Sequence, residues 1–228
     1  MDTKNVKVKV HLSFYTDRMQ TRDEKKAQTR KSLMDAALNL TGNGSNFSSI
    51  SLREVAKNAG VVPTSFYRHF SDMEELGLNI IDDLGLLLRK LMRQARRNDE
   101  YFDALARSSV EFYANYVCSH KNYFYFMEQV KTGGTSTLRK AIRKELNYFA
   151  NELASDIRPL KEFSDASDAD LIIICQLIVD TVFENTIDLL DQVEEDPAYI
   201  DTYTEHTLKK LRLIWIGAMH WDSRSRKG

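Results

Sequence analysis

The chain has 228 residues, of which 43% are hydrophobic and 29% charged, a composition typical of a globular protein with an ample core. That composition excludes collagen-like, mucin-like and wholly disordered proteins. Lys and Arg (32) nearly balance Asp and Glu (33), so the net charge of −1 by itself argues against a dedicated nucleic-acid binder, which tends to be strongly basic.

The sequence predicts neither a membrane span nor a secreted protein. No apolar run approaches the roughly 20 residues that cross a bilayer, and the start of the chain lacks the apolar stretch of a signal peptide. Cys118 and Cys175 have no CxxC spacing, so we interpret them as small buried hydrophobes rather than as a disulfide or metal site. We therefore expect a cytoplasmic, nucleoid-associated protein without membrane insertion.

A persistent 3.6-residue apolar period and few chain breakers (3 Pro and 9 Gly) predict an all-α protein of about nine helices. Residues 1–20 alternate apolar and polar side chains like a strand that has no partner, which predicts a disordered arm. A first domain follows at 21–71 and a second at 72–228. The helices are expected at 22–41, 52–58, 63–69, 72–97, 100–118, 121–131, 136–156, 167–192 and 198–221.

Residues 51–70 have the pattern of a helix-turn-helix unit. Ser51 and Glu54 form a capping box that begins one helix, Gly60 suits a sharp turn, and Pro63 suits the first turn of the next helix. An ordinary helical corner is the alternative. The combination of this pattern with a basic helix before it favours a DNA-binding unit.

Short polar donors lie on the second helix of this unit, and Lys and Arg lie on the helix before it. Such donors reach base edges from a major groove, while Lys and Arg hold phosphates. Residues 1–97 carry 17 Lys and Arg against 11 Asp and Glu, whereas residues 98–228 carry 15 against 22, so the near-zero total hides a basic end. The residues predicted to contact DNA are Lys25, Arg30, Ser51, Arg53, Pro63, Thr64, Ser65, Tyr67, Arg68 and His69.

Two stretches, Ser51-Leu-Arg-Glu-Val-Ala-Lys-Asn-Ala-Gly60 and Thr64-Ser-Phe-Tyr-Arg-His-Phe70, resemble the DNA-binding domain of the TetR family of bacterial repressors. Glu75-Leu-Gly-Leu78, Leu91-Met-Arg-Gln-Ala-Arg96 and Gly134-Thr-Ser136 with Arg139 further resemble the FabR and DesT regulators of unsaturated fatty acid synthesis. The resemblance implies a repressor that binds a palindromic double-stranded operator as a homodimer. It also implies an effector that is a long-chain acyl-CoA or acyl-carrier protein, with no cofactor.

The resemblance implies that the last two helices join two chains in a four-helix bundle. The helix expected at 167–192 agrees, because it is apolar over much of its circumference and must bury more than one face. The residues predicted for the dimer interface are Leu171, Ile174, Cys175, Ile178, Val182, Leu211, Ile214, Trp215 and Ala218.

A long acyl chain would need an apolar lining, and aromatic residues are dense between residues 112 and 183. The predicted ligand contacts are Phe112, Tyr116, Phe124, Phe126, Arg139, Phe149 and Phe183, although plain core packing is the simpler interpretation of each aromatic. Headgroup phosphates are candidate partners for Arg89, Arg93, Arg96, Arg97, Arg139 and Arg143, for which a solvated helix face is the simpler interpretation.

Three alternatives stay open. The chain is a TetR-type repressor of another regulon with a different hydrophobic ligand, a helical enzyme acting on lipids, or a dimerisation module without DNA binding. The enzyme is disfavoured because GxSxG, P-loop and HExxH motifs are missing from the sequence, and we predict that the chain is not an enzyme. The intact polar helix at 63–69 disfavours the third alternative.

Overall fold

The computed structural model describes residues 21–96, 101–163 and 166–221, and all regular structure in these ranges is helical, as predicted. The arm predicted at 1–20 and Arg97 lie outside the described residues. Most helix ends fall within three residues of the predicted ones. The α-helices are α1 (Arg22–Gly42), α2 (Leu52–Asn58), α3 (Pro63–Phe66), α4 (Met73–Arg96), α5 (Phe102–Ser119), α6 (Lys121–Gly133), α7 (Ser136–Ile157), α8 (Asp168–Glu184), α9 (Thr186–Glu195) and α10 (Tyr199–Met219), with short 3₁₀ turns η1 (Phe47–Ser49) and η2 (Lys161–Phe163).

The helix expected at 167–192 is divided at Asn185 into α8 and α9. The Thr186 hydroxyl donates to the Phe183 carbonyl at 2.8 Å and lies 2.7 Å from the buried Tyr113 hydroxyl. Side-chain hydrogen bonds of this kind offer the backbone an alternative to a continuous helix. The apolar period runs through the break, so the sequence pattern did not reveal it.

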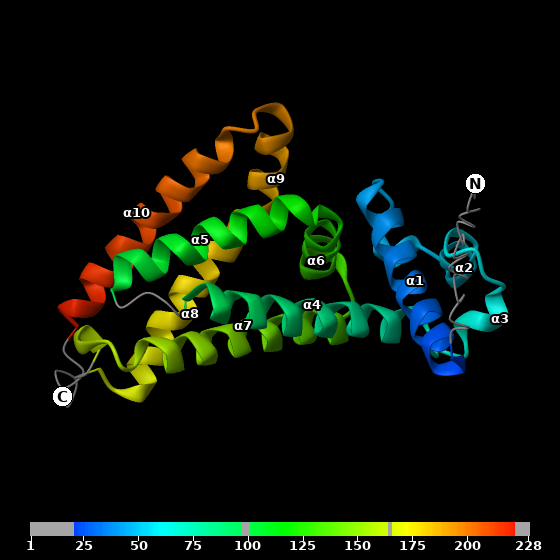
Figure 1. Ribbon diagram of the computed structural model, residues 1–228, viewed down its shortest axis with the longest axis horizontal. Coiled ribbons are helices and arrows are strands. Elements are labelled where there is room, and N and C mark those ends of the chain that lie inside the picture. The colour runs from blue at the N-terminus through cyan, green and yellow to red at the C-terminus, as the bar shows by residue number, and fades with distance from the viewer. Residues whose placement is uncertain (1–20, 97–100, 164–165, 222–228) are drawn as a thin grey trace, which may run out of the picture.

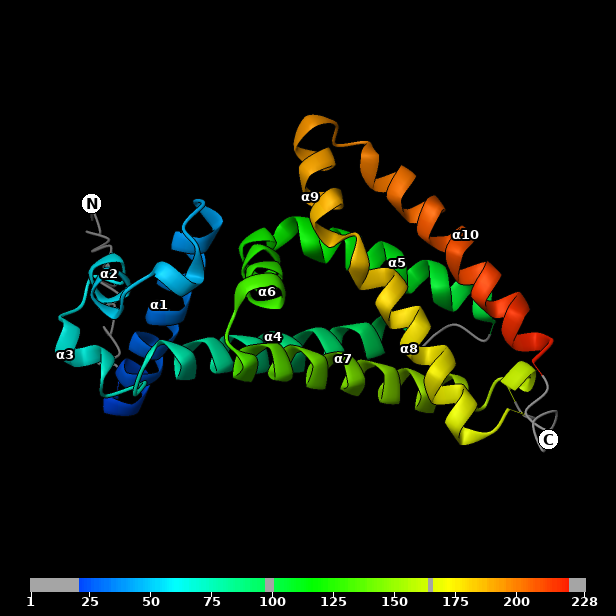
Figure 2. The ribbon, with the colours of Figure 1, turned by 180° about the vertical axis from the view of Figure 1, so that it is seen from behind.

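Two hydrophobic cores share the helix α4. Leu76 and Ile80 belong to the smaller core with α1, α2 and α3, whereas Leu84 and Leu88 belong to the larger core with α5, α7 and α8. In Figures 1 and 2, α4 runs from the α1–α3 group into the larger helical body. The proposed domain boundary at 71–72 therefore separates parts of the chain whose side chains pack in a common core.

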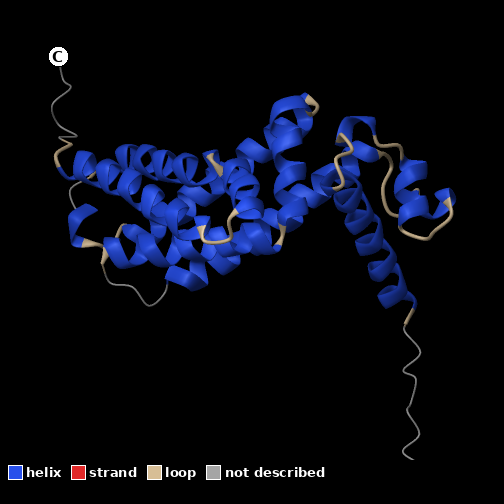
Figure 3. Ribbon diagram, turned by 90° about the horizontal axis from the view of Figure 1, so that it is seen from above, coloured by secondary structure: helices blue, strands red, loops and turns tan. Residues whose placement is uncertain are grey.

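A second connection joins the α1–α3 group to the larger body through α6. The Asn122 side chain donates to that of Asn39 on α1 at 3.0 Å. Gln129 accepts from the Phe47 amide at 2.9 Å and donates to the Ser45 carbonyl at 3.3 Å. Seen from above, the α1–α3 group lies at one end of an elongated molecule (Figure 3). Helices α4 and α6 thus both contact the α1–α3 group and hold it in place.

Helices α4 and α7 run side by side (Figures 1 and 2). Gly85 leaves room for the Glu145 carboxylate of α7, which a Cβ at this position would overlap. At Gly77 a Cβ would lie 3.0 Å from the Leu138 side chain, which is a tight contact. Within the described ranges, no helix combines the length and apolar character that a membrane crossing requires.

Candidate functional site

The helix-turn-helix predicted at 51–70 is formed by α2 and α3. The Ser51 hydroxyl accepts from the Glu54 amide at 3.3 Å, and the Glu54 carboxylate accepts from the Ser51 amide at 2.8 Å. Gly60 has a φ of +70°, a left-handed conformation that glycine adopts without strain, and Ala56 is fully buried at the helix crossing. The capping box and turn predicted from the sequence are therefore both present.

Helix α3 and the turn that follows it carry exposed side chains, most of them polar. Tyr67 is 60% exposed, and Pro63, Thr64 and Arg68 are also exposed. Helix α3 is shorter than predicted, because after Phe66 the chain continues as hydrogen-bonded turns rather than as regular helix.

A basic cleft of about 590 Å³ lies between the first half of α1 and α3. Five of its eight lining residues are Lys, Arg or His, and Lys25, Ser65, Arg68 and His69 were predicted to contact DNA. Arg53, another residue predicted to contact DNA, is exposed on α2. The lining residues are Arg22, Asp23, Lys25, Lys26, Thr29, Ser65, Arg68 and His69.

His69 reports the positive potential of this cleft. Partial burial lowers the pKa of His69 below the ordinary 6.5, and the charges of Lys26, Arg30 and Arg68 lower it further. The imidazole is thus predominantly neutral near neutral pH. An anion placed in the cleft would oppose the surrounding cations and raise the pKa again.

Two of the predicted DNA contacts also form interactions within the chain. The Arg30 guanidinium donates to the Asn79 side chain of α4 and lies over the Phe70 ring, 4.8 Å from its centroid. The hydroxyl of Ser51 is held by the Glu54 carboxylate in the capping box. The DNA contacts of these two residues stay predictions, since Ser51 is exposed and Arg30 is partly exposed.

The larger body contains two apolar cavities. The first, of about 70 Å³, lies between α4, α6, α7 and the α8–α9 junction, and the second, of about 50 Å³, lies between α4, α5, α7, α8 and α10. The first is lined by Ile81, Leu84, Gly85, Leu88, Phe124, Met127, Glu128, Lys131, Ile142, Glu145, Leu146, Phe149, Phe183 and Thr186. The second is lined by Met92, Arg96, Phe102, Leu105, Ala106, Ser109, Val110, Phe149, Leu153, Ile178, Val179, Val182, Phe183 and Leu211.

Three of the predicted ligand residues line these cavities: Phe124, Phe149 and Phe183. The other four are elsewhere, as a correction to the prediction. Phe126 packs edge-on against Phe47 in the smaller core, 4.8 Å between centroids, and Arg139 donates to the Gly134 carbonyl at the start of α7.

Phe112 and Tyr116 also lie outside both cavities. Tyr116 stacks between Phe112, at 6.0 Å, and His120, at 4.1 Å between ring centroids. The number of aromatic residues in a segment cannot show which of them pack in the core and which line a cavity. The aliphatic cavity residues of α4 and α7 had no distinguishing signal in the sequence.

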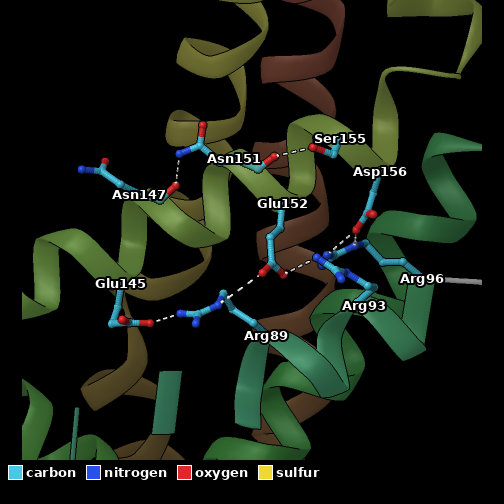
Figure 4. A network of polar contacts seen from close by, with 9 residues as sticks. All are labelled: Arg89, Arg93, Arg96, Glu145, Asn147, Asn151, Glu152, Ser155 and Asp156. Carbon is cyan, nitrogen blue, oxygen red and sulfur yellow. Dashed lines mark hydrogen bonds and ion pairs between the residues drawn. The ribbon is translucent and has the colours of Figure 1, made fainter. Parts of the chain in front are cut away.

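A ladder of ion pairs joins α4 to α7 beside the cavities (Figure 4). Arg89 pairs with Glu145 and lies 3.4 Å from Glu152, Arg93 lies 3.0 Å from Glu152, and Arg96 pairs with Asp156 at 2.6 Å. Arg89, Arg96 and Glu145 are buried, each at most 8% exposed. We call these six residues the α4–α7 ladder.

The ladder corrects both earlier interpretations of the α4 arginines. Arg89 and Arg96 are neither solvated nor free for headgroup phosphates, because carboxylates of α7 hold them. Arg93 is half-exposed and paired, and Arg143 is exposed. The sequence contains both the arginines of α4 and the acids of α7, but their pairing depends on how the two helices pack.

The predicted dimer residues lie largely inside the protomer. Buried residues cannot contact a second chain, so the prediction was wrong for Leu171, Ile174, Cys175, Ile178, Val182 and Leu211, each at most 8% exposed. Burial also raises the pKa of the Cys175 thiol to about 12, consistent with its interpretation as a buried hydrophobe. The remaining three, Ile214, Trp215 and Ala218, are half-buried against the larger core.

Other residues of the same two helices face outward. Ile173 and Leu177 on α8 are 54% and 51% exposed, and Leu213 and Ile216 on α10 are 70% and 50% exposed. Exposed apolar residues at helical spacing on two contacting helices are typical of an unpartnered interface. These outward faces, unlike the predicted inner ones, are accessible to a partner.

Comparison with known proteins identifies the class of this fold. Residues 33–79, which include α2, α3 and the start of α4, match the family described as bacterial regulatory proteins, tetR family. Beyond the matched residues, the fold is similar to solved transcriptional regulators over more than 80% of the chain, and the matched family and these structures are described as regulators.

Three solved structures illustrate the similarity. The fatty acid degradation regulator FadR from Bacillus halodurans aligns with a TM-score of 0.67 and 17% identity over 83% of this chain and 95% of its own. FadR from Bacillus subtilis, in complex with stearoyl-CoA, aligns with a TM-score of 0.64 and 17% identity over 82% of this chain and 98% of its own. A transcriptional regulator from Rhodococcus sp. RHA1 aligns with a TM-score of 0.63 and 21% identity over 86% of this chain and 99% of its own.

The lowered pKa of His69 leads to a prediction for DNA binding. NMR titration of the free protein should give a His69 pKa below 6.5, and addition of duplex DNA should raise it, because phosphates in the cleft stabilise the imidazolium. Acidification below neutrality should therefore strengthen DNA binding. The NMR chemical shifts of His206, which is exposed on the distant α10, should not change when DNA is added. A His69 pKa that DNA leaves unchanged would place phosphates elsewhere.

Proposed function

We propose that the protein is a ligand-responsive transcriptional repressor that binds a palindromic operator as a homodimer. The observation that carries this proposal is the exposed polar surface of α3 beside the basic cleft of α1. Tyr67 and Arg68 are positioned for base edges, while Lys25 and Lys26 are positioned for phosphates. Cleft and surface together form the basic end of an otherwise acidic chain.

We propose a long-chain acyl thioester, acyl-CoA or acyl-carrier protein, as the effector. The support is the apolar lining of both cavities together with the similarity to a regulator bound to stearoyl-CoA. The sequence resemblance to FabR and DesT favours genes of unsaturated fatty acid synthesis as the regulon. The alternative is a different hydrophobic effector, and the gel-shift titration described below distinguishes the two.

The proposed switch acts through α4. Ile81, Leu84 and Leu88 line the first cavity from α4, and the same helix contributes Leu76 and Ile80 to the core under the helix-turn-helix. A ligand that packs better against one orientation of α4 shifts the population toward it, by no more than its difference in affinity for the two orientations. The spacing of the two α3 surfaces in the dimer changes accordingly.

We propose that the dimer forms through the outward faces of α8 and α10. Ile173, Leu177, Leu213 and Ile216 supply the apolar surface, and a two-fold axis would pair each helix with its counterpart. The pairing of these faces gives the four-helix bundle that the sequence resemblance implies.

Replacement of Arg68, in the turn after α3, by Ala should weaken operator binding by about tenfold or more, because a side chain that bonds a base edge contributes roughly 1–3 kcal/mol. Operator DNA is first selected from random duplexes with the unmodified protein, and affinity is measured by gel shift. Lys209→Ala, an exposed cation on α10, is the matched control and should bind as the unmodified protein does. Equal affinity of both variants would reject α3 as the DNA-reading element.

Operator affinity should change on addition of stearoyl-CoA or oleoyl-CoA, and the two should differ, since a kinked chain fills an apolar cavity differently from a straight one. Gel-shift titration measures this, with CoA alone as the control for the headgroup. If neither acyl-CoA alters operator affinity while another apolar compound does, the regulator belongs to a different ligand class.

Replacement of Leu177 by Glu should shift the protein toward monomer, because a carboxylate would be buried in the proposed apolar interface. Sedimentation velocity measures the change. Leu86→Glu, at a residue that is 55% exposed on α4 and outside the proposed interface, should leave the dimer intact. A Leu177→Glu protein that remains dimeric would place the interface on another surface.

A further inference from the structure

Val62 is an apolar residue whose side chain neither packs in a core nor caps a helix. The side chain is 62% exposed, and Val62 occupies the N-cap position of α3 without a side-chain hydrogen bond to that helix. Val is among the least favourable N-cap residues, whereas Ser, Thr, Asp or Asn would satisfy a backbone amide there. A polar residue at this position would therefore suit both the solvent and the helix better than Val62 does.

The place of Val62 in the fold relates it to the surface proposed to read DNA. Between residues 21 and 72, all of which the structure describes, the exposed large hydrophobic residues are Val62 and Tyr67, one at each end of α3. Pro63 beside Val62 is exposed as well, whereas Arg68 at the other end lines the basic cleft. The surface is therefore apolar where α3 starts and cationic beyond its end.

The start of α3 has few groups that can form a hydrogen bond with a base. The side chains of Val62 and Pro63 carry neither donor nor acceptor, and Pro63 has no backbone N–H. In helix-turn-helix proteins, the first residues of the second helix reach base edges in the major groove. The apolar group that a base presents there is the C5-methyl of thymine. An apolar side chain at this point of the surface therefore gains most from a thymine.

We propose that Val62 is a specificity-determining residue, which contacts the C5-methyl group of one thymine in each half of the operator. The inference rests on the proposed binding of a palindromic operator through α3, and it names a base that this surface selects. The contact is made by the side chain and is apolar. It adds to sequence specificity without adding to the attraction between the basic cleft and phosphates.

The backbone around Val62 holds the side chain in place for such a contact. The Val62 carbonyl accepts from the Ser65 amide at 2.8 Å, and the Val61 amide donates to the Ala56 carbonyl at 2.9 Å. Pro63 restricts the conformation of the residue before it, and a β-branched side chain has few rotamers. A side chain that is already ordered loses little conformational entropy on binding, so its contact with a methyl group contributes to affinity.

The test removes one methyl group at a time from the DNA. Operator DNA selected with the full chain is synthesised with uracil in place of each thymine in turn, which deletes the C5-methyl and keeps the base pair. At the thymine that Val62 contacts, this change should weaken binding by about fourfold, as expected for one methyl group that is no longer buried. Replacement in both half-sites should weaken binding by the square of that factor. Gel shift measures each affinity.

The Val62→Ala variant identifies the thymine that Val62 contacts. With this variant, the difference in affinity between thymine and uracil DNA should disappear at that position and persist at any other. Leu86→Ala, at an exposed apolar residue of α4 that is 55% exposed, is the matched control and should keep every difference. Both replaced side chains are exposed, so we expect both variants to fold, and a thermal melt verifies this.

A second change to the DNA separates the methyl group from the rest of thymine. 5-Methylcytosine paired with guanine carries the same C5-methyl on a different base pair. At the position assigned to Val62, the unmodified protein should bind 5-methylcytosine DNA about fourfold more tightly than cytosine DNA, and Val62→Ala should bind the two equally. Equal binding of the two by the unmodified protein would overturn the methyl contact.

The outcomes distinguish this contact from the function on which it rests. If uracil weakens binding nowhere, or weakens it equally for the unmodified protein and Val62→Ala, the assignment of Val62 is overturned and DNA binding through α3 still stands. If the unmodified protein selects no duplex sequence, the proposed operator binding is rejected, and the thymine contact with it.

Discussion

The contact between α4 and α7 is the constraint on which the rest of the structure depends. Gly85 lets the Glu145 carboxylate approach the α4 backbone, where it meets Arg89. Two charges removed from water are costly unless they remain paired, and loss of one partner of a buried pair typically destabilises by about 3–5 kcal/mol. The ladder therefore fixes α4 in register along α7 at the level of the cavities. Any ligand in the cavities acts on a helix whose position is set by a few paired charges and by the apolar packing around them.

The same helix carries this constraint to the DNA-binding unit. Arg30 of α1 bonds Asn79 of α4 and covers Phe70, so the basic helix is fixed to α4 by a cation that sequence analysis assigned to DNA. A second tie runs through Gln129 of α6 to the residues before α2. The two ties connect the α1–α3 group to the larger body at two separate helices. The proposed α4 switch needs rigid contacts between α4 and the DNA-binding unit. It also needs a space in the larger body that a ligand can occupy, and the apolar cavities are the candidates for that space.

Local signals predicted the DNA-binding unit well and the other sites poorly. The capping box of Ser51 with Glu54 and the turn at Gly60 are decided by residues within a few positions of one another, so the sequence pattern identified them. The α8 residues predicted for the dimer face are buried in their own chain, because α8 is apolar around most of its circumference and periodicity cannot say which side packs inward. Leu171 and Leu177 are alike as residues, yet one is buried and the other is exposed. The ligand residues failed for the same reason, since Phe126 and Phe149 differ only in the core to which they belong.

The sequence by itself determined an all-helical chain, the positions of nearly all its helices, and a basic helix-turn-helix end opposed to an acidic remainder. These follow from caps, breakers, periodicity and charge, which act over one or two turns of chain. Only the tertiary structure decided the division of α8 from α9, the pairing of the α4 arginines with α7, and the placing of Phe149 and Phe183 between two cavities. Each of these depends on side chains far apart in sequence, which meet only when the helices have packed, and pairwise packing is not encoded in any local pattern.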